Sequence, residues 1–219
     1  MGIMVALHAA DGHTLRAYRA GPDEAARGLV VVQEIFGVNH HIRKVCDRFA
    51  ALGYAVVAPA LFDRVQREVE LGYGPENVKA GLALRAQVPK AGIVADIGAG
   101  AAALPAACGI VGYCWGGTVA WWGAMGTSLF RAAVGWYGGG IAQAKGGTPH
   151  CPVQLHLGEK DASIPMNSVR AIQAAQLGVE IHTYPGAGHG FGCDERAEFD
   201  PAAYQLAEER TLAFLETHL

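Results

Sequence analysis

Short apolar segments alternate along the chain with segments of helical character, and this alternation decides the fold class. The clearest apolar runs, over 27–36, 54–61, 108–113 and 152–158, are typical of strands buried on both faces of a sheet. Strands that alternate with helices form βαβ units in a mostly parallel sheet. The sequence therefore predicts an α/β fold with about eight strands and with helices on both faces of the sheet.

Turn and cap residues mark the ends of several predicted elements. Asp11-Gly12 separates two strand-like runs, so the first two strands are expected to form an antiparallel hairpin. Asn39 is a favourable N-cap for a helix over 40–52, and Gly53 fits its C′ position. Further strands are expected over 131–137 and 179–185, and further helices over 75–87, 91–106, 116–126, 165–177 and 201–218.

Composition sets limits on size, partners and location. A chain of 219 residues, 51% apolar and 17% charged, is expected to form one domain, 1–219, with a large buried core. The net charge of −3 disfavours nucleic acid or an anionic membrane as a partner. Five scattered cysteines without a CxxC pair favour a reducing compartment. No signal peptide and no apolar run of about 20 residues is found, so we expect a cytoplasmic protein, a monomer or a small homo-oligomer.

One short glycine-rich pattern, Gly112-Tyr113-Cys114-Trp115-Gly116-Gly117, lies between a predicted strand and a predicted helix. It matches the G-x-S-x-G nucleophile elbow of α/β-hydrolases, with cysteine in the serine position. The sharp turn of an elbow crowds the backbone, so the positions two before and two after the nucleophile need to lack a side chain. Cys114 is thus expected at a helix N-terminus, where a thiolate is favoured. The Trp115 N–H would face the developing oxyanion.

An acid and a histidine follow the cysteine in the order that α/β-hydrolases use. Asp161 and His189 each come just after a predicted strand. Both would lie beyond the carboxyl ends of strands, where open α/β sheets bind ligands. Glu159 is a rival for the acid because it lies nearer to the strand end. Asp161 is preferred because Ile164-Pro165 forms a rigid corner for its loop.

Another carboxylate occurs in the segment Gln33-Glu34-Ile35-Phe36-Gly37-Val38-Asn39. Glu34 has apolar neighbours and would be costly to bury without a partner. We expect it in the pocket of Cys114, because its strand should neighbour the strand of the nucleophile; a helix-capping or salt-bridging glutamate is the alternative. The Ile35 N–H would supply the second oxyanion-hole donor. As a hypothesis, Glu34 keeps Cys114 protonated until substrate displaces it. The aromatic side chains expected to line the substrate pocket are Phe36, Trp136 and Tyr137.

Taken together, the segments QEIFGVN, GYCWGG, GEKDASIP and GAGHGF resemble the dienelactone hydrolase family of α/β-hydrolases. The resemblance extends from about Asp11 to the C-terminus. It implies opening of lactone or ester bonds, with 4-carboxymethylenebutenolide as the family's named substrate. It also implies a triad of Cys114, Asp161 and His189 and an associated glutamate, Glu34. The oxyanion donors that it implies are the backbone N–H groups of Ile35 and Trp115.

The sequence departs from this family at one substrate-binding position. Characterised members are similar in having arginines that hold the substrate carboxylate, one of them shortly after the triad histidine. Cys193 stands at that position here. Arg64, Arg67 and Arg85 are the open choices for another such arginine. This weakens the case for dienelactone itself as the substrate and leaves a small ester or lactone as the expectation.

The cysteine motif also allows other interpretations. A non-catalytic relative that binds a small molecule or senses redox state through Cys114 is the alternative. A glutaminase-type cysteine elbow expects a His-x-Glu pair late in the chain, and none occurs. The histidines lack metal-ligand spacing, and neither a Walker motif nor a GxGxxG after a strand is present. No metal and no cofactor are therefore expected.

Overall fold

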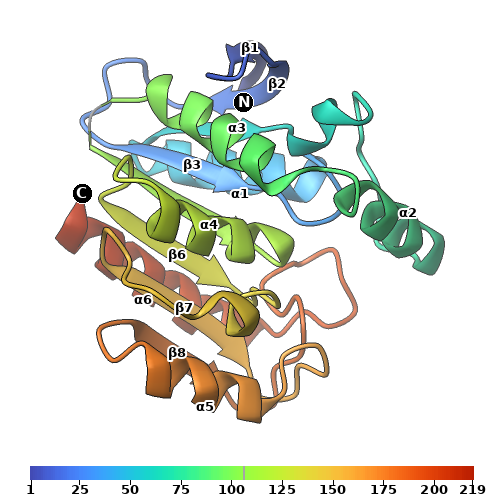
Figure 1. Ribbon diagram of the computed structural model, residues 1–219, viewed down its shortest axis with the longest axis vertical. Helices are drawn as coiled ribbons and strands as arrows, with labels where there is room; N and C mark the ends of the chain where they lie inside the picture. Colours follow the sequence, from blue (N-terminus) through green and yellow to red (C-terminus); the bar gives the residue numbers. More distant parts are fainter. Residues whose placement is uncertain (106) are drawn as a thin grey trace. The chain divides into compact units, whose positions relative to one another are not determined.

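The computed structural model describes residues 1–105 and 107–219 (Figure 1). Its contacts divide the chain into two compact units, Met1–Ile110 and Val111–Leu219. Eight strands occur in the described residues, and most of their pairings are parallel. The predicted α/β class with about eight mostly parallel strands is confirmed. The single domain over 1–219 stays a prediction.

The first unit carries its strands in the order β1-β2-β4-β3, with β1 and β2 antiparallel and β3 and β4 parallel. The predicted hairpin at Asp11-Gly12 is confirmed, since His8 of β1 pairs with Thr14 of β2. Figure 1 shows α3 in front of these strands and α1 behind them. The elements are β1 Ile3–His8, β2 Thr14–Ala20, β3 Gly28–Val32, α1 His40–Ala51, β4 Ala55–Pro59, the 3-10 helix η1 Leu61–Arg64, α2 Pro75–Arg85 and α3 Lys90–Ala102.

The second unit carries its strands in the order β5-β6-β7-β8, with β6, β7 and β8 parallel. Strand β5, Cys108–Tyr113, begins in the first unit and ends in the second. Within the second unit, α4 lies in front of the strands and α6 behind them (Figure 1). The other elements are α4 Trp115–Gly126, β6 Ala132–Trp136, η2 Ala142–Ala144, β7 Val153–Gly158, α5 Met166–Ala175, β8 Glu180–Tyr184 and α6 Pro201–His218.

Helix α1 begins and ends where its cap residues predict. The Asn39 side chain accepts a hydrogen bond from the Ile42 N–H at 3.2 Å, which satisfies one of the donors at the helix start. Gly53 has φ 88°, the left-handed conformation that stops a helix. The apolar face of the helix buries Val45 and Phe49 against the strands of its unit. Both cap predictions are confirmed.

Two sequence expectations differ from the structure. The strand expected over 27–36 ends at Val32, and residues 33–36 are buried without belonging to a strand. There Gln33 accepts a hydrogen bond from the Leu61 N–H, so a side chain takes the place of a strand partner. The helix expected over 91–106 spans Lys90–Ala102, and residue 106 lies outside the described residues. Strand β2 pairs antiparallel with β4 as well as with β1.

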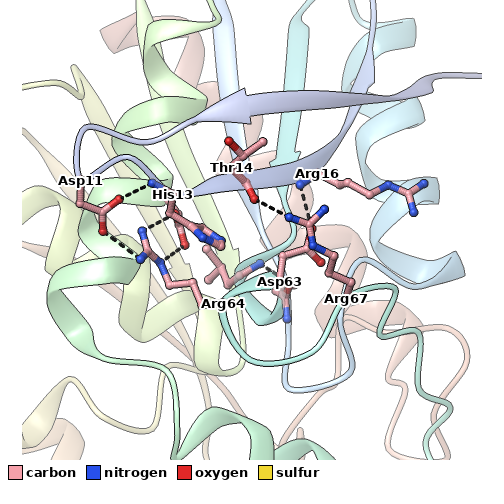
Figure 2. Close-up of polar contacts among 10 residues, drawn as sticks. Asp11, His13, Thr14, Arg16, Asp63, Arg64 and Arg67 are labelled. Atoms are coloured by element: carbon pink, nitrogen blue, oxygen red, sulfur yellow. Dashed lines mark hydrogen bonds and ion pairs between the residues drawn. The ribbon is translucent and has the colours of Figure 1, made fainter.

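An ion cluster joins three elements of the first unit around Arg64 (Figure 2). Its guanidinium forms two bonds to the buried Asp96 of α3, of 2.7 and 2.8 Å, and a third of 2.8 Å to Asp11 in the hairpin turn. Burial raises the pKa of Asp96, although the Arg64 charge opposes that shift. Arg64 therefore has a structural role, since it neutralises a buried carboxylate and ties the hairpin to α3.

Candidate active site

Cys114 forms a sharp turn between β5 and α4. Its backbone has φ 55° and ψ −119°, a left-handed conformation that is strained for a residue with a side chain. The Cys114 N–H donates to the Trp136 carbonyl at 3.0 Å, and the Cys114 carbonyl accepts from the Gly117 N–H at 3.0 Å. These bonds hold the turn between two buried elements of the second unit. Trp115, the expected oxyanion donor, is the first residue of α4.

Glycine is required beside this turn because backbone atoms approach closely. A Cβ at Gly112 would lie 1.9 Å from the Gly116 carbonyl oxygen, a distance no side chain can tolerate. A Cβ at Gly117 would lie 2.6 Å from the Trp136 carbonyl oxygen. The first contact agrees with the expectation for the position two residues before the nucleophile. The second adds a glycine that the five-residue elbow pattern does not include.

The structure brings together three of the predicted site residues, all in the second unit. The Sγ atom of Cys114 lies 3.2 Å from Nε2 of His189, within hydrogen-bond distance for sulfur. The other ring nitrogen, Nδ1, lies 2.7 Å from Oδ2 of Asp161. Asp161 is 2% exposed, whereas Cys114 is half-buried. This arrangement can move a proton between the thiol and a histidine that a buried carboxylate orients.

Two carboxylates compete for the histidine in the sequence, and the structure separates them. Asp161 bonds His189 with one oxygen and accepts the Ser163 N–H with the other at 2.8 Å. Glu159 instead accepts a hydrogen bond from the Thr183 hydroxyl on an exposed surface. Asp161-Ala162-Ser163 forms an Asx turn, and an aspartate in a short loop after a strand is a local signal for such a turn.

Hydrogen bonds near the strand ends link the Asp161 loop to the His189 loop. The carbonyl of Tyr184, the last residue of β8, accepts the N–H of Glu159 at 3.1 Å and the N–H of Ala187 at 3.3 Å. The Lys160 N–H donates to the Ala187 carbonyl at 2.9 Å. The acid and the histidine are therefore carried by loops that share backbone bonds.

Opposing effects set the pKa of His189. Burial acts to lower this pKa because it disfavours the charged ring. Hydrogen bonds to Asp161 and to Cys114 favour the protonated ring and outweigh burial, so the pKa rises to about 10. The charged imidazole is therefore favoured at neutral pH, and its Nε2 proton points at the sulfur.

Comparison with known proteins identifies the family. A model described as the dienelactone hydrolase family matches residues 15–219, nearly the whole chain. This chain belongs to the dienelactone hydrolase family. It is a hydrolase, and its fold is the α/β-hydrolase fold, as predicted.

Named relatives of the dienelactone hydrolase family cover most of this chain. A Synechocystis protein named "Putative carboxymethylenebutenolidase" is 35% identical over 212 residues, which cover 87% of this chain and 86% of the relative. The "Carboxymethylenebutenolidase" of Pseudomonas putida is 32% identical, over 96% of this chain and 94% of its own length. A crystal structure titled as a "Putative Dienelactone Hydrolase" from Klebsiella pneumoniae matches with a TM-score of 0.84 and 32% identity, over 99% of each chain.

Aromatic residues at the carboxyl end of β6 pack around the histidine of this family member. Tyr137 has φ 40° and is fully buried, and its ring meets the His189 ring edge-on with centroids 5.4 Å apart. Trp136 is 1% exposed and packs against Phe191, with centroids 5.6 Å apart. Of these two predicted lining residues, Tyr137 contacts the site directly, whereas Trp136 belongs to the packing beneath it.

The other predicted site residues lie in the first unit, between β3 and α1. Glu34 is fully buried, and one of its carboxylate oxygens accepts the Tyr73 hydroxyl at 3.1 Å. Phe36 packs against the same tyrosine, with ring centroids 4.6 Å apart. Ile35, which lies between Glu34 and Phe36 in the sequence, is also buried. Their predicted place beside Cys114 stays a prediction, and Tyr73 is a neighbour of Glu34 that no sequence signal indicated.

The structure shows different surroundings for the residues weighed as carboxylate binders. Arg64 is engaged by Asp11 and Asp96, and the exposed Arg67 donates to the Thr14 carbonyl at 3.1 Å (Figure 2). Arg85 is exposed at the end of α2. Cys193 is fully buried in the second unit. Arg64 and Arg67 thus already serve contacts within the first unit.

No helix within residues 1–105 and 107–219 has both the length and the apolar character needed to cross a bilayer. That the enzyme requires no metal and no cofactor remains a prediction.

Proposed function

We propose that this chain is a cysteine-dependent hydrolase of small ester or lactone substrates that works through an acyl-enzyme. The observation that carries the proposal is the alignment of Cys114, His189 and Asp161, with 3.2 Å between sulfur and imidazole and 2.7 Å between imidazole and carboxylate. Family membership supports hydrolysis as the reaction. The carboxymethylenebutenolidase names of relatives support a lactone or ester as the substrate class.

The first half-reaction transfers the acyl group to sulfur. The Cys114 thiolate attacks the carbonyl carbon, an S–C bond forms, and the carbonyl electron pair moves onto oxygen. The backbone N–H groups of Trp115 and Ile35 are the proposed donors to this oxyanion. The oxyanion then collapses, the C–O bond to the alcohol breaks, and the Nε2 proton of His189 passes to the leaving alkoxide.

The second half-reaction releases the acid. Neutral His189 takes a proton from water, which attacks the thioester carbonyl, and the C–S bond breaks to return the thiolate. Asp161 holds the Nδ1 proton of His189 through both steps, so that Nε2 stays directed at the reacting atoms. A thioester forms more readily from an ester than from an amide, which favours esters and lactones over peptides.

A burst experiment with p-nitrophenyl acetate tests the proposal. The wild-type protein should release one equivalent of nitrophenol in a fast phase as Cys114 is acylated. Cys114→Ala and His189→Ala should each lose this phase, whereas the matched thiol control Cys151→Ala should keep it. If Cys114→Ala keeps the burst, or if wild type shows none, the proposed mechanism is wrong.

The alternative, a non-catalytic binder or redox sensor acting through Cys114, is separated by the same assay. It predicts no burst, together with reversible oxidation of Cys114. A panel of lactones and esters against wild type and Cys114→Ser would then identify the preferred acyl group. Because Arg64 is already bound by the buried Asp96 and by Asp11, we propose substrates whose binding does not depend on a carboxylate held by Arg64.

Glu34 is proposed to keep the Cys114 thiol protonated until substrate binds. Its complete burial, in a family with a triad-associated glutamate, motivates this role. Glu34→Gln should raise the thiolate absorbance of the resting enzyme and leave it unchanged in the presence of a carboxylate product mimic. An unchanged thiolate fraction in both states would remove this role.

Location and assembly are proposals as well. All five cysteines are free thiols, which fits a reducing compartment such as the cytoplasm. A monomer or a small homo-oligomer is the proposed state, and light scattering on the purified protein tests it.

A further inference from the structure

A fully buried histidine, His156 of β7, takes no part in the proposed chemistry. Its Nδ1 atom lies 2.7 Å from the Tyr184 hydroxyl. Its Nε2 atom lies 2.8 Å from the Gln154 side-chain oxygen and 3.0 Å from the Thr211 hydroxyl. Both ring nitrogens are thus occupied inside the second unit, and a buried network of this kind specifies one arrangement of its members.

The surroundings decide which ring nitrogen carries the proton. The Gln154 amide nitrogen donates to the Glu180 carboxylate at 2.9 Å and to the Arg210 carbonyl at 3.3 Å, so the amide oxygen must face His156. The facing nitrogen, Nε2, therefore donates, and Nδ1 accepts the hydrogen bond of the Tyr184 hydroxyl.

Burial keeps this hydrogen bond in one direction. It holds the pKa of His156 well below its ordinary value, and the nearby charges of His182 and Arg210 act in the same direction. Burial also raises the pKa of the Tyr184 hydroxyl, and this outweighs the opposing effect of Arg210. At neutral pH the imidazole stays a neutral acceptor and the phenol stays a donor.

Tyr184 is the residue at which the two loops of the site meet. Its carbonyl accepts the N–H of Glu159, which begins the loop of Asp161, and the N–H of Ala187, which lies in the loop of His189. The backbone position of Tyr184 therefore helps to set the positions of both Asp161 and His189.

A second path runs from Tyr184 through packed rings. The Tyr184 ring packs on Phe191, with centroids 5.0 Å apart, and Phe191 packs on Tyr137 at 5.4 Å. Tyr137 in turn meets the His189 ring edge-on at 5.4 Å. The bond to His156 fixes the orientation of the Tyr184 ring. That orientation thus affects the position of the His189 ring through these packed rings as well as through the backbone.

We propose that His156, acting through the Tyr184 hydroxyl, is a positioning residue that keeps the Asp161 carboxylate and the His189 ring at their observed positions relative to each other. The inference rests on the proposed function, because it assigns a role in the acylation of Cys114. The hydrogen bond fixes the orientation of the Tyr184 ring, and that residue carries the backbone acceptor shared by the two loops. Small displacements of reacting groups lower rates strongly, so the relative position of Asp161 and His189 should affect the acylation rate.

The test uses the full-length protein with Tyr184→Phe, His156→Phe and the double variant. Tyr184→Phe removes only the hydroxyl and keeps the ring against Phe191. We expect the acylation rate constant with p-nitrophenyl acetate to fall roughly tenfold in each single variant, with the half-saturating ester concentration changed less than about twofold. Both changes delete the bond between His156 and Tyr184, and His156→Phe also loses the contacts to Gln154 and Thr211. The double variant should therefore be no slower than the slower single variant.

A matched control removes a phenol hydroxyl elsewhere in the same unit. Tyr204→Phe deletes the bond to Glu208 in α6 and should leave the acylation rate within about twofold of wild type. Equal losses in Tyr204→Phe and Tyr184→Phe, multiplicative losses in the double variant, or an unchanged rate in Tyr184→Phe would overturn the proposal.

A substrate-free measurement separates this proposal from the proposed function. The Nδ1 proton of His189, bonded to Asp161, should give a downfield NMR signal in the wild type that shifts or broadens in Tyr184→Phe and stays in place in Tyr204→Phe. If wild type shows no burst while the signal responds in this way, the hydrolase mechanism fails and the positioning role stands. If the burst is normal and the NMR signal is unchanged in Tyr184→Phe, the positioning role of His156 is wrong and the hydrolase mechanism stands.

Discussion

The Oδ2 atom of Asp161 lies 2.7 Å from Nδ1 of His189, although 28 residues of chain separate the two. Both residues follow strands of the second unit, and backbone bonds at Tyr184 join their loops. Glu159, only two residues before Asp161, turns to the exposed Thr183 hydroxyl instead.

This difference predicts opposite outcomes for the two acids. Asp161→Asn keeps the shape but loses the charge that stabilises the imidazolium, and turnover should fall roughly 10³-fold. Glu159→Gln should stay within about twofold of wild type, since its side chain serves an exposed contact. Steady-state hydrolysis of p-nitrophenyl acetate gives both values. A large loss in Glu159→Gln with normal turnover in Asp161→Asn would reassign the acid.

Alkylation should distinguish Cys114 from the other thiols. Burial raises the pKa of Cys151 to about 11 and that of Cys108 to about 12, so few thiolates form there at neutral pH. Iodoacetamide at limiting concentration should modify Cys114 first, as peptide mass spectrometry will show. His189→Ala should slow that modification, because Cys114 then lacks the ring nitrogen that lies 3.2 Å from its sulfur and exchanges its proton. Faster labelling of the half-buried Cys151 would contradict this expectation.

Stability should depend on pH through His189. Its folded pKa of about 10 lies above the ordinary 6.5, so the folded state binds this proton more tightly than the unfolded state. The resulting stabilisation is complete below 6.5 and is lost as pH rises through about 10. The free energy of unfolding in urea of wild type minus that of His189→Gln should therefore shrink over this range. A difference that is flat or that grows with pH would contradict the raised pKa.

Glycine substitutions around α4 should have opposite outcomes. Gly112→Ala places a methyl 1.9 Å from the Gly116 carbonyl oxygen, and we expect at least about 3 kcal/mol of destabilisation or failure to fold. Gly126→Ala, at the exposed end of the same helix, meets nothing within 4 Å and should be neutral or stabilising by up to about 1 kcal/mol. Urea unfolding measures both. Comparable stability of the two variants would show that the turn relaxes around a methyl group.

Two arginines of the first unit give another matched pair. Arg64→Met leaves the carboxylate of Asp96 buried without its cation, and the free energy of unfolding should fall by about 3 kcal/mol. Arg67→Met removes an exposed bond to a backbone carbonyl and should cost about 0.5 kcal/mol or less. Chemical denaturation with both variants checks this, and equal losses would contradict the structural role of Arg64.

Features that depend on neighbouring residues could be predicted from the sequence. Asn39 and Gly53 bound a helix because capping and left-handed backbone are properties of single positions. The elbow at Cys114 is likewise local, since the atom that leaves no room for a Cβ at Gly112 is the carbonyl oxygen of Gly116, four residues away. Strand-end positions then brought Asp161 and His189 into consideration, because parallel strands end at the same edge.

Features that depend on distant partners could not be predicted in the same way. The apolar run over 27–36 looks like one strand, yet a Gln33 side chain bonded 28 residues away ends the pairing at Val32. His156 shows no motif, because its partner Tyr184 lies 28 residues along the chain. The Ile164-Pro165 corner favours Asp161 over Glu159 in the sequence, but the bond between Asp161 and His189 depends on how two loops 28 residues apart meet.

The turn at Cys114 also limits how this enzyme could be redesigned. Its neighbours Gly112 and Gly117 are confined by main-chain oxygen atoms, which cannot step aside as a flexible side chain would. Variants that aim to change the substrate preference of the proposed hydrolase should therefore keep Gly112 and Gly117 and substitute other residues near Cys114.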